Sequence, residues 1–124
     1  MKPGATSAIL APTMKPLHPP SADHQPIACN LGAFTPEQRS RRQALAQELQ
    51  SLIREVRPLD NGYEGRFDPD NLTLLKLAEF VGVERRCCPF ITFEVVVNDG
   101  AGPILLRLTG RPGTKEFLAG WLGA

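Results

Sequence analysis

The sequence predicts an α+β fold in the order α-β-α-β-β-α, with the helices packed on one face of a small three-stranded sheet. Two long segments carry apolar residues at helical spacing, and the segments between and after them alternate like strands. The chain has 124 residues, of which 42% are hydrophobic and 22% charged. These values are typical of a single globular domain.

The N-terminal segment differs from the rest of the chain. Residues 1–26 are rich in Pro, mix it with Ser, Ala and His, and show no periodicity. Such a composition is typical of a flexible tail. The sequence therefore predicts a Pro-rich tail over 1–26 and one α+β domain over 27–124.

A first helix is predicted to follow Thr35-Pro36-Glu37-Gln38. The threonine is a favourable N-cap, the proline suits the first helical position, and the glutamine completes a capping box. Apolar residues then recur at helical spacing and predict an amphipathic helix: Leu45, Leu49, Leu52, Ile53 and Val56. Pro58 is expected to end this helix.

A second helix is predicted to begin after Asp68-Pro69. Pro89 disfavours helical geometry for Cys88, so the helix should end at about Cys87. Its apolar stripe is wide and predicts that the helix is covered on more than one side: Leu72, Leu74, Leu75, Leu77, Ala78, Phe80 and Val81. A small chain has limited surface to cover such a helix, so a homodimer is an open alternative.

The remaining segments predict strands, turns and a last helix. Residues 59–62 form a turn before a short strand at 63–67. Residues 90–97 and 104–109 alternate like the two strands of a hairpin, with a Gly-rich loop between them. Thr114 is expected to cap a short C-terminal helix.

The global composition excludes several classes of function. The net charge is +1, and no aromatic residues interleave the arginine clusters, so a nucleic-acid partner is not expected. No apolar run approaches the ~20 residues of a membrane span. Three cysteines cannot form a closed disulfide framework, which favours a reducing, cytoplasmic setting.

The segment Glu84-Arg85-Arg86-Cys87-Cys88 contains the strongest candidate site. Helical phase places Cys88 on the core-facing stripe and Cys87 about 100° around the axis. Glu84 lies one turn before Cys88, within reach of its side chain. The two thiols are therefore expected at a helix end, with one pointing inward and one sideways.

Three interpretations of these cysteines remain open. A redox pair usually has C-x-x-C spacing at a helix N-terminus, where thiolate is favoured, so adjacent thiols at a C-terminus fit poorly. Adjacent cysteines also suit tetrahedral zinc poorly. Soft, low-coordinate ions such as Hg(II), As(III) and Cu(I) accept two or three thiolates in open geometry. The third interpretation is that the cysteines pack as small hydrophobic residues.

Further residues are candidates to complete an ion site. Cys29 precedes the first helix and could supply a third sulfur, with His24 as a more distant fourth ligand. Arg85 and Arg86 would help to hold thiolates, and Glu84 would position Arg85 or accept thiol protons. The sequence thus predicts Cys29, Cys87 and Cys88 as ligands of a soft metal or metalloid ion.

The motifs of the chain resemble those of a known group. Several segments resemble a group of small bacterial proteins: 27–31, 34–39, 77–81, the run Glu84-Arg85-Arg86-Cys87-Cys88-Pro89-Phe90-Ile91-Thr92-Phe93, 102–110 and 115–118. The Cys-Cys-Pro-Phe part is also similar to the C-terminal segment of some MerR-like heavy-metal-responsive regulators. The resemblance spans about residues 27–118.

The resemblance implies a function in heavy-metal chemistry, with Cys29, Cys87 and Cys88 as candidate ligands. A helix-turn-helix module of the regulator type does not precede the motif in this sequence. We therefore expect thiol-based sensing, sequestration or detoxification handover of an ion. A thiol enzyme and a module with packed cysteines remain the alternatives.

Overall fold

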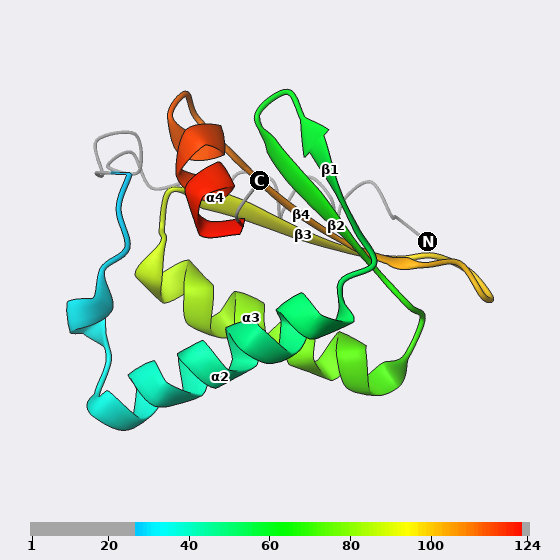
Figure 1. Ribbon diagram of the computed structural model, residues 1–124, viewed down its shortest axis with the longest axis horizontal. Coiled ribbons are helices and arrows are strands. Elements are labelled where there is room, and N and C mark those ends of the chain that lie inside the picture. Colours follow the sequence, from blue (N-terminus) through cyan, green and yellow to red (C-terminus); the bar gives the residue numbers. More distant parts are fainter. Residues whose placement is uncertain (1–26, 123–124) are drawn as a thin grey trace, which may run out of the picture.

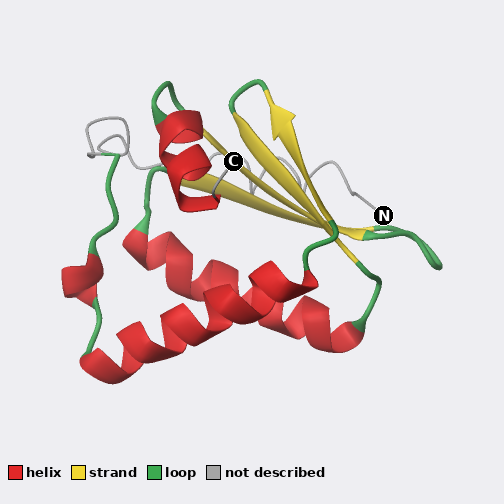
Figure 2. Cartoon of the chain, viewed as in Figure 1, coloured by secondary structure: helices red, strands yellow, loops and turns green. Residues whose placement is uncertain are grey.

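The computed structural model describes residues 27–122. The tail predicted for residues 1–26, including His24, lies outside this described part. Two long helices run in opposite directions and cross beside a sheet (Figures 1 and 2). The elements are η2 (Leu31–Ala33), α2 (Pro36–Leu52), β1 (Glu55–Leu59), β2 (Gly62–Phe67), α3 (Asn71–Cys87), β3 (Ile91–Val97), β4 (Ile104–Gly110) and α4 (Thr114–Leu122). Within 27–122, no helix combines the length and apolarity that a bilayer crossing requires.

The four strands form one antiparallel sheet in the order β1-β2-β4-β3. The α+β class predicted from the sequence is confirmed. The predicted three-stranded sheet was wrong, because β1 adds a fourth strand next to β2.

The extra strand arises because α2 ends earlier than the apolar stripe suggests. Ile53 is the C-cap, and its ψ of 132° is already extended. Val56, predicted on the helix, instead pairs with Gly65 of β2. Pro58 lies opposite Tyr63 on an edge strand, where a missing N–H can face away from the sheet. Pro58 therefore belongs to a strand rather than to a helix end.

The helix boundaries nearest the cysteines follow local sequence signals. Thr35 caps α2 through the predicted capping box with Gln38. The N-cap of α3 is Asp70, not the Asp68 expected from sequence, and its carboxylate accepts the N–H of Thr73 at 3.0 Å. At the other end, α3 stops at Cys87 as predicted, with Cys88 as its C-cap.

The larger hydrophobic core of the described residues lies between the sheet and helices α2, α3 and α4. Its buried side chains are Leu45, Leu49, Phe67, Leu77, Phe80, Ile104, Leu106, Leu108 and Leu118. Leu72 and Leu75, which the wide stripe of α3 includes, are each 66% exposed within this chain. The core thus covers only part of the stripe.

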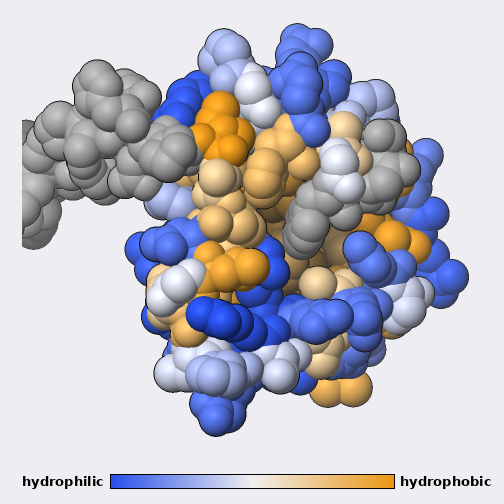
Figure 3. Space-filling view, turned by 60° about the vertical axis from the view of Figure 1, so that its left-hand side comes forward, coloured by the Kyte–Doolittle hydropathy of each residue, from blue (hydrophilic) through white to orange (hydrophobic). Residues whose placement is uncertain are grey.

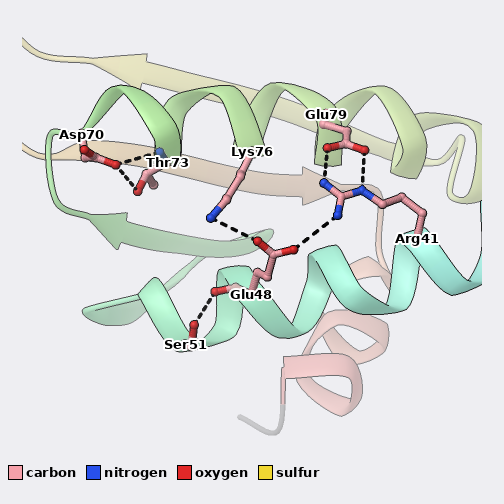
Figure 4. A network of polar contacts seen from close by, with 7 residues as sticks. All are labelled: Arg41, Glu48, Ser51, Asp70, Thr73, Lys76 and Glu79. Carbon is pink, nitrogen blue, oxygen red and sulfur yellow. Dashed lines mark hydrogen bonds and ion pairs between the residues drawn. The ribbon is translucent and has the colours of Figure 1, made fainter.

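A network of charged side chains joins α2 to α3 at the surface (Figure 4). Arg41 donates from Nε and Nη2 to the two carboxylate oxygens of Glu79, at 2.9 and 2.7 Å. Glu48 lies between Arg41 and Lys76, with ion-pair distances of 3.4 and 3.1 Å. These contacts link the exposed faces of α2 and α3.

Candidate metal centre

Three sulfur atoms from two distant segments meet at the C-terminal end of α3. Cys87 is the last residue of α3, Cys88 is its C-cap, and Cys29 lies in the segment before η2. The Sγ atoms of Cys29 and Cys87 are 2.7 Å apart, and those of Cys29 and Cys88 are 3.0 Å apart. All three are free thiols. The structure therefore brings together the three cysteines that the sequence singled out.

The segment that carries Cys29 is held against the end of α3 by several contacts. The N–H of Asn30 donates to the carbonyl of Cys87 at 2.8 Å. Arg86 donates to the carbonyl of Ala33 at 3.1 Å, and its guanidinium lies 5.0 Å from the centre of the Phe34 ring. On this side of the molecule, hydrophobic residues gather in the middle of the face, between hydrophilic margins (Figure 3).

The cysteines differ in their access to solvent. Cys87 and Cys88 are 0% and 2% exposed and pack with Phe34 and Phe90 in a second, smaller hydrophobic cluster, whereas Cys29 is only partly buried. Burial, followed by the contact with Cys29, raises the pKa of Cys87 to about 11. The pKa of Cys88 is raised by the same two causes. These two thiols are thus protonated at neutral pH in the absence of an ion.

A buried ion pair completes the cluster. Glu84 is 3% exposed, and its two carboxylate oxygens accept from Nε and Nη2 of Arg42 at 2.6 and 3.1 Å. Nη2 of Arg42 also lies 3.3 Å from Cys29 Sγ. Burial lowers the pKa of Arg42, but the contacts with Glu84 outweigh this effect and raise it overall. Arg42 is therefore a permanent positive charge beside the sulfurs.

Together, these groups form a potential metal-binding cluster. One ligand atom from each of Cys29, Glu84, Cys87 and Cys88 lies within 4.8 Å of the corresponding atoms of the other three. A cavity of about 10 Å³ adjoins the cluster, which is roughly the space of one water molecule. Its lining includes Cys29, Arg42, Phe80, Glu84, Cys88, Ile91, Phe93, Leu108 and Phe117.

The sequence predicted that Arg85 and Arg86 lie beside the thiols, and the structure places them elsewhere. Arg85 is exposed, and Arg86 contacts Ala33 and Phe34 rather than a sulfur. The guanidinium at the thiols is that of Arg42, which was not among the site residues predicted from the sequence. The sequence did contain a signal for it, because Arg42 precedes Leu45 by three residues and so extends the buried stripe of α2.

Comparisons of the chain with protein families, with curated proteins and with solved structures find no match. The chemistry of the cluster is therefore the basis for assigning a function.

Proposed function

We propose that this protein binds a soft heavy-metal or metalloid ion through Cys29, Cys87 and Cys88. The observation that carries this proposal is the convergence of three sulfurs from segments 58 and 59 residues apart in sequence. Cysteines that serve only as small hydrophobic residues have no need to turn their sulfurs toward one another. Thiolates select soft ions such as Hg(II), As(III) and Cu(I).

The surroundings of the sulfurs support a binding role. Cys87 and Cys88 are shielded by the smaller hydrophobic cluster, which would protect a bound ion from competing water. Cys29, the partly exposed sulfur, offers the first contact for an incoming ion. This arrangement suits sensing, sequestration or handover of an ion, in a reducing compartment such as the cytoplasm where thiols persist. The Cys-Cys-Pro-Phe resemblance to heavy-metal-responsive regulators agrees with this proposal.

Ion binding to the reduced protein tests the proposal. Titration with Hg(II), arsenite or Cu(I) should show about one equivalent bound per chain, and Cys87→Ser or Cys88→Ser should abolish binding. Because a ligand that binds only the folded state stabilises it, the melting temperature of the wild type should also rise with ion concentration. Circular dichroism of each variant establishes that it is folded. Unchanged binding in both folded variants would sink the proposal.

A thiol redox function is the second candidate, because Cys29 Sγ and Cys87 Sγ are already 2.7 Å apart. Hydrogen peroxide would take two electrons and the two thiol protons, leaving a Cys29–Cys87 disulfide and two water molecules. Peptide mapping after peroxide treatment tests this candidate. A disulfide formed at submillimolar peroxide, in a protein that binds none of the three ions, would favour it over metal binding.

A further inference from the structure

The donor atoms of the cluster are three sulfurs rather than three sulfurs and a carboxylate. Both oxygens of Glu84 already accept charge-assisted hydrogen bonds from Arg42. Recruiting Glu84 as a ligand would break a buried ion pair and leave Arg42 without its counter-charge, which is costly. An ion that needs a fourth protein ligand, as structural zinc does, therefore fits this cluster poorly.

The charge of the site favours a trivalent centre. Three thiolates and a trivalent ion sum to zero, and Arg42 with Glu84 also sums to zero. A divalent ion bound to three thiolates would leave one negative charge, and a monovalent ion would leave two. Uncompensated charge is expensive in a site where the carboxylate and two of the three thiols, those of Cys87 and Cys88, are almost entirely buried.

The spacing of the sulfurs points in the same direction. Tetrahedral zinc, with Zn–S bonds of about 2.3 Å, holds its sulfurs about 3.8 Å apart. A linear two-coordinate ion holds them twice a bond length apart. The Cys29–Cys87 and Cys29–Cys88 separations of 2.7 and 3.0 Å are shorter than either arrangement. A pyramidal ion binds its three ligands on one side at angles below the tetrahedral value, so at equal bond length it holds the sulfurs closer together than zinc or a linear ion does. The cluster must therefore widen least to take a pyramidal ion.

On these grounds, and resting on the proposed function, we propose that the substrate class is a trivalent metalloid hydroxide, with arsenite, As(OH)3, as its representative. Each of Cys29, Cys87 and Cys88 replaces one hydroxyl group. An As–S bond forms while an As–O and an S–H bond break, and the hydroxyl leaves with the thiol proton as water. Three water molecules are released, arsenic stays trivalent, and no proton goes to solvent or to Glu84.

Arg42 acts in this scheme as a positioning residue. Cys29 lies outside α3, so its sulfur must be held over the helix end for the third bond to form. The Arg42 Nη2 contact at 3.3 Å and the Asn30–Cys87 backbone hydrogen bond do this. Glu84 in turn fixes the guanidinium through both carboxylate oxygens.

The test compares arsenite with phenylarsine oxide, whose arsenic keeps its phenyl group and can form only two bonds to sulfur. Native mass spectrometry of the reduced wild type with arsenite should show the mass of one arsenic atom less three hydrogens. Cys29→Ser should weaken arsenite binding roughly a hundredfold by removing one arm of the chelate. Its affinity for phenylarsine oxide should stay within about threefold of wild type, because Cys87 and Cys88 suffice.

The same pair of probes separates positioning from a purely structural role. Arg42→Gln should lower the affinity for arsenite roughly tenfold and leave the affinity for phenylarsine oxide nearly unchanged. Arg42→Lys should restore part of the lost arsenite affinity. A structural defect would lower the affinity for both probes together. Arg41→Gln is the matched control, because Arg41 neighbours Arg42 on α2 but pairs with Glu79 at the surface. It should leave both affinities unchanged.

Three outcomes would overturn the inference. The first is a wild-type adduct that retains a hydroxyl group on arsenic, which would mean two sulfur bonds. The second is zinc bound more tightly than arsenite and weakened by Glu84→Gln, which would make Glu84 a ligand. The third is Hg(II) bound through the cysteines with no arsenite adduct; the proposed function would then stand without this inference. If the cysteines bind no ion, both fail.

Discussion

Two arginine–glutamate pairs join α2 to α3, and they differ in burial rather than in geometry. In each, Nε and Nη2 of the arginine donate to the two carboxylate oxygens. The side chains of Arg41 and Glu79 are 48% and 41% exposed and belong to the surface network of Figure 4. Those of Arg42 and Glu84 are 18% and 4% exposed, and Arg42 also contacts Cys29 Sγ.

The difference shows why burial, more than geometry, indicates a site. Exposed ion pairs contribute little to stability because water solvates both partners well. A buried pair has lost that solvation, and well-packed apolar residues often serve stability equally well in its place. The burial of Arg42 and Glu84 is thus poorly explained by stability alone. Their position beside three converging thiols offers a functional explanation.

Removing the carboxylate of each pair should give the largest difference between them, measured as the loss in the free energy of unfolding. Glu84→Gln should destabilise the protein by about 3 kcal/mol, because Arg42 stays largely buried without a counter-charge. Glu79→Gln should have no more than roughly a third of that effect, because water can solvate Arg41. Urea denaturation of the reduced proteins, monitored by circular dichroism, measures both changes.

These two substitutions are matched, because both glutamates lie on α3 and both pair with neighbouring arginines of α2. Equal free energies of unfolding for the two variants would contradict the distinction between a buried and an exposed pair. A larger loss for Glu79→Gln would place the main link between the helices at the surface.

Much of the fold could be predicted from the sequence because it is encoded locally. The capping box at Thr35 and the stop of α3 before Pro89 both depend on a few neighbouring residues. The strand β1 could not be predicted in this way. Val56 fits the period of the preceding helix, but pairing with Gly65, nine residues later in β2, makes its segment a strand. Tertiary pairing thus overrode a helical pattern.

In the site, too, the features set by neighbouring residues could be predicted, and the contacts between residues far apart in sequence could not. The place of Cys87 and Cys88 at the helix end followed from Pro89. Helical phase predicted that Cys88 points inward and Cys87 sideways, whereas both are buried in one hydrophobic cluster. The identity of the arginine at the sulfurs could not be predicted, because Arg42 and Glu84 are 42 residues apart and meet only through helix packing. Adjacency in sequence favoured Arg85 and Arg86 instead. Adjacent residues on a helix point in different directions, so adjacency was a poor guide.

Salt should change the coupling energies of the two ion pairs to different extents, and this difference should be smaller than the one between the two glutamate substitutions. Double-mutant cycles with Gln at both positions give the coupling energy within each pair. Raising the ionic strength from about 0.1 to about 1 M shortens the screening length from about 10 to about 3 Å, so the Arg41–Glu79 coupling should vanish. The Arg42–Glu84 coupling should keep most of its value. Loss of both couplings in parallel would indicate that water and ions reach the thiol cluster freely.

Acid should produce the smallest effect, which we expect at the surface pair. Hydrogen bonds from Arg41 lower the pKa of Glu79 below its ordinary value. The stabilising contribution is therefore complete above the unfolded-state pKa of about 4.3 and is lost as the pH falls through the lower folded-state value. The urea midpoints of the wild type and Glu79→Gln should differ most near pH 6 and converge toward pH 3. A constant difference over this range would mean that Glu79 contributes through packing rather than charge.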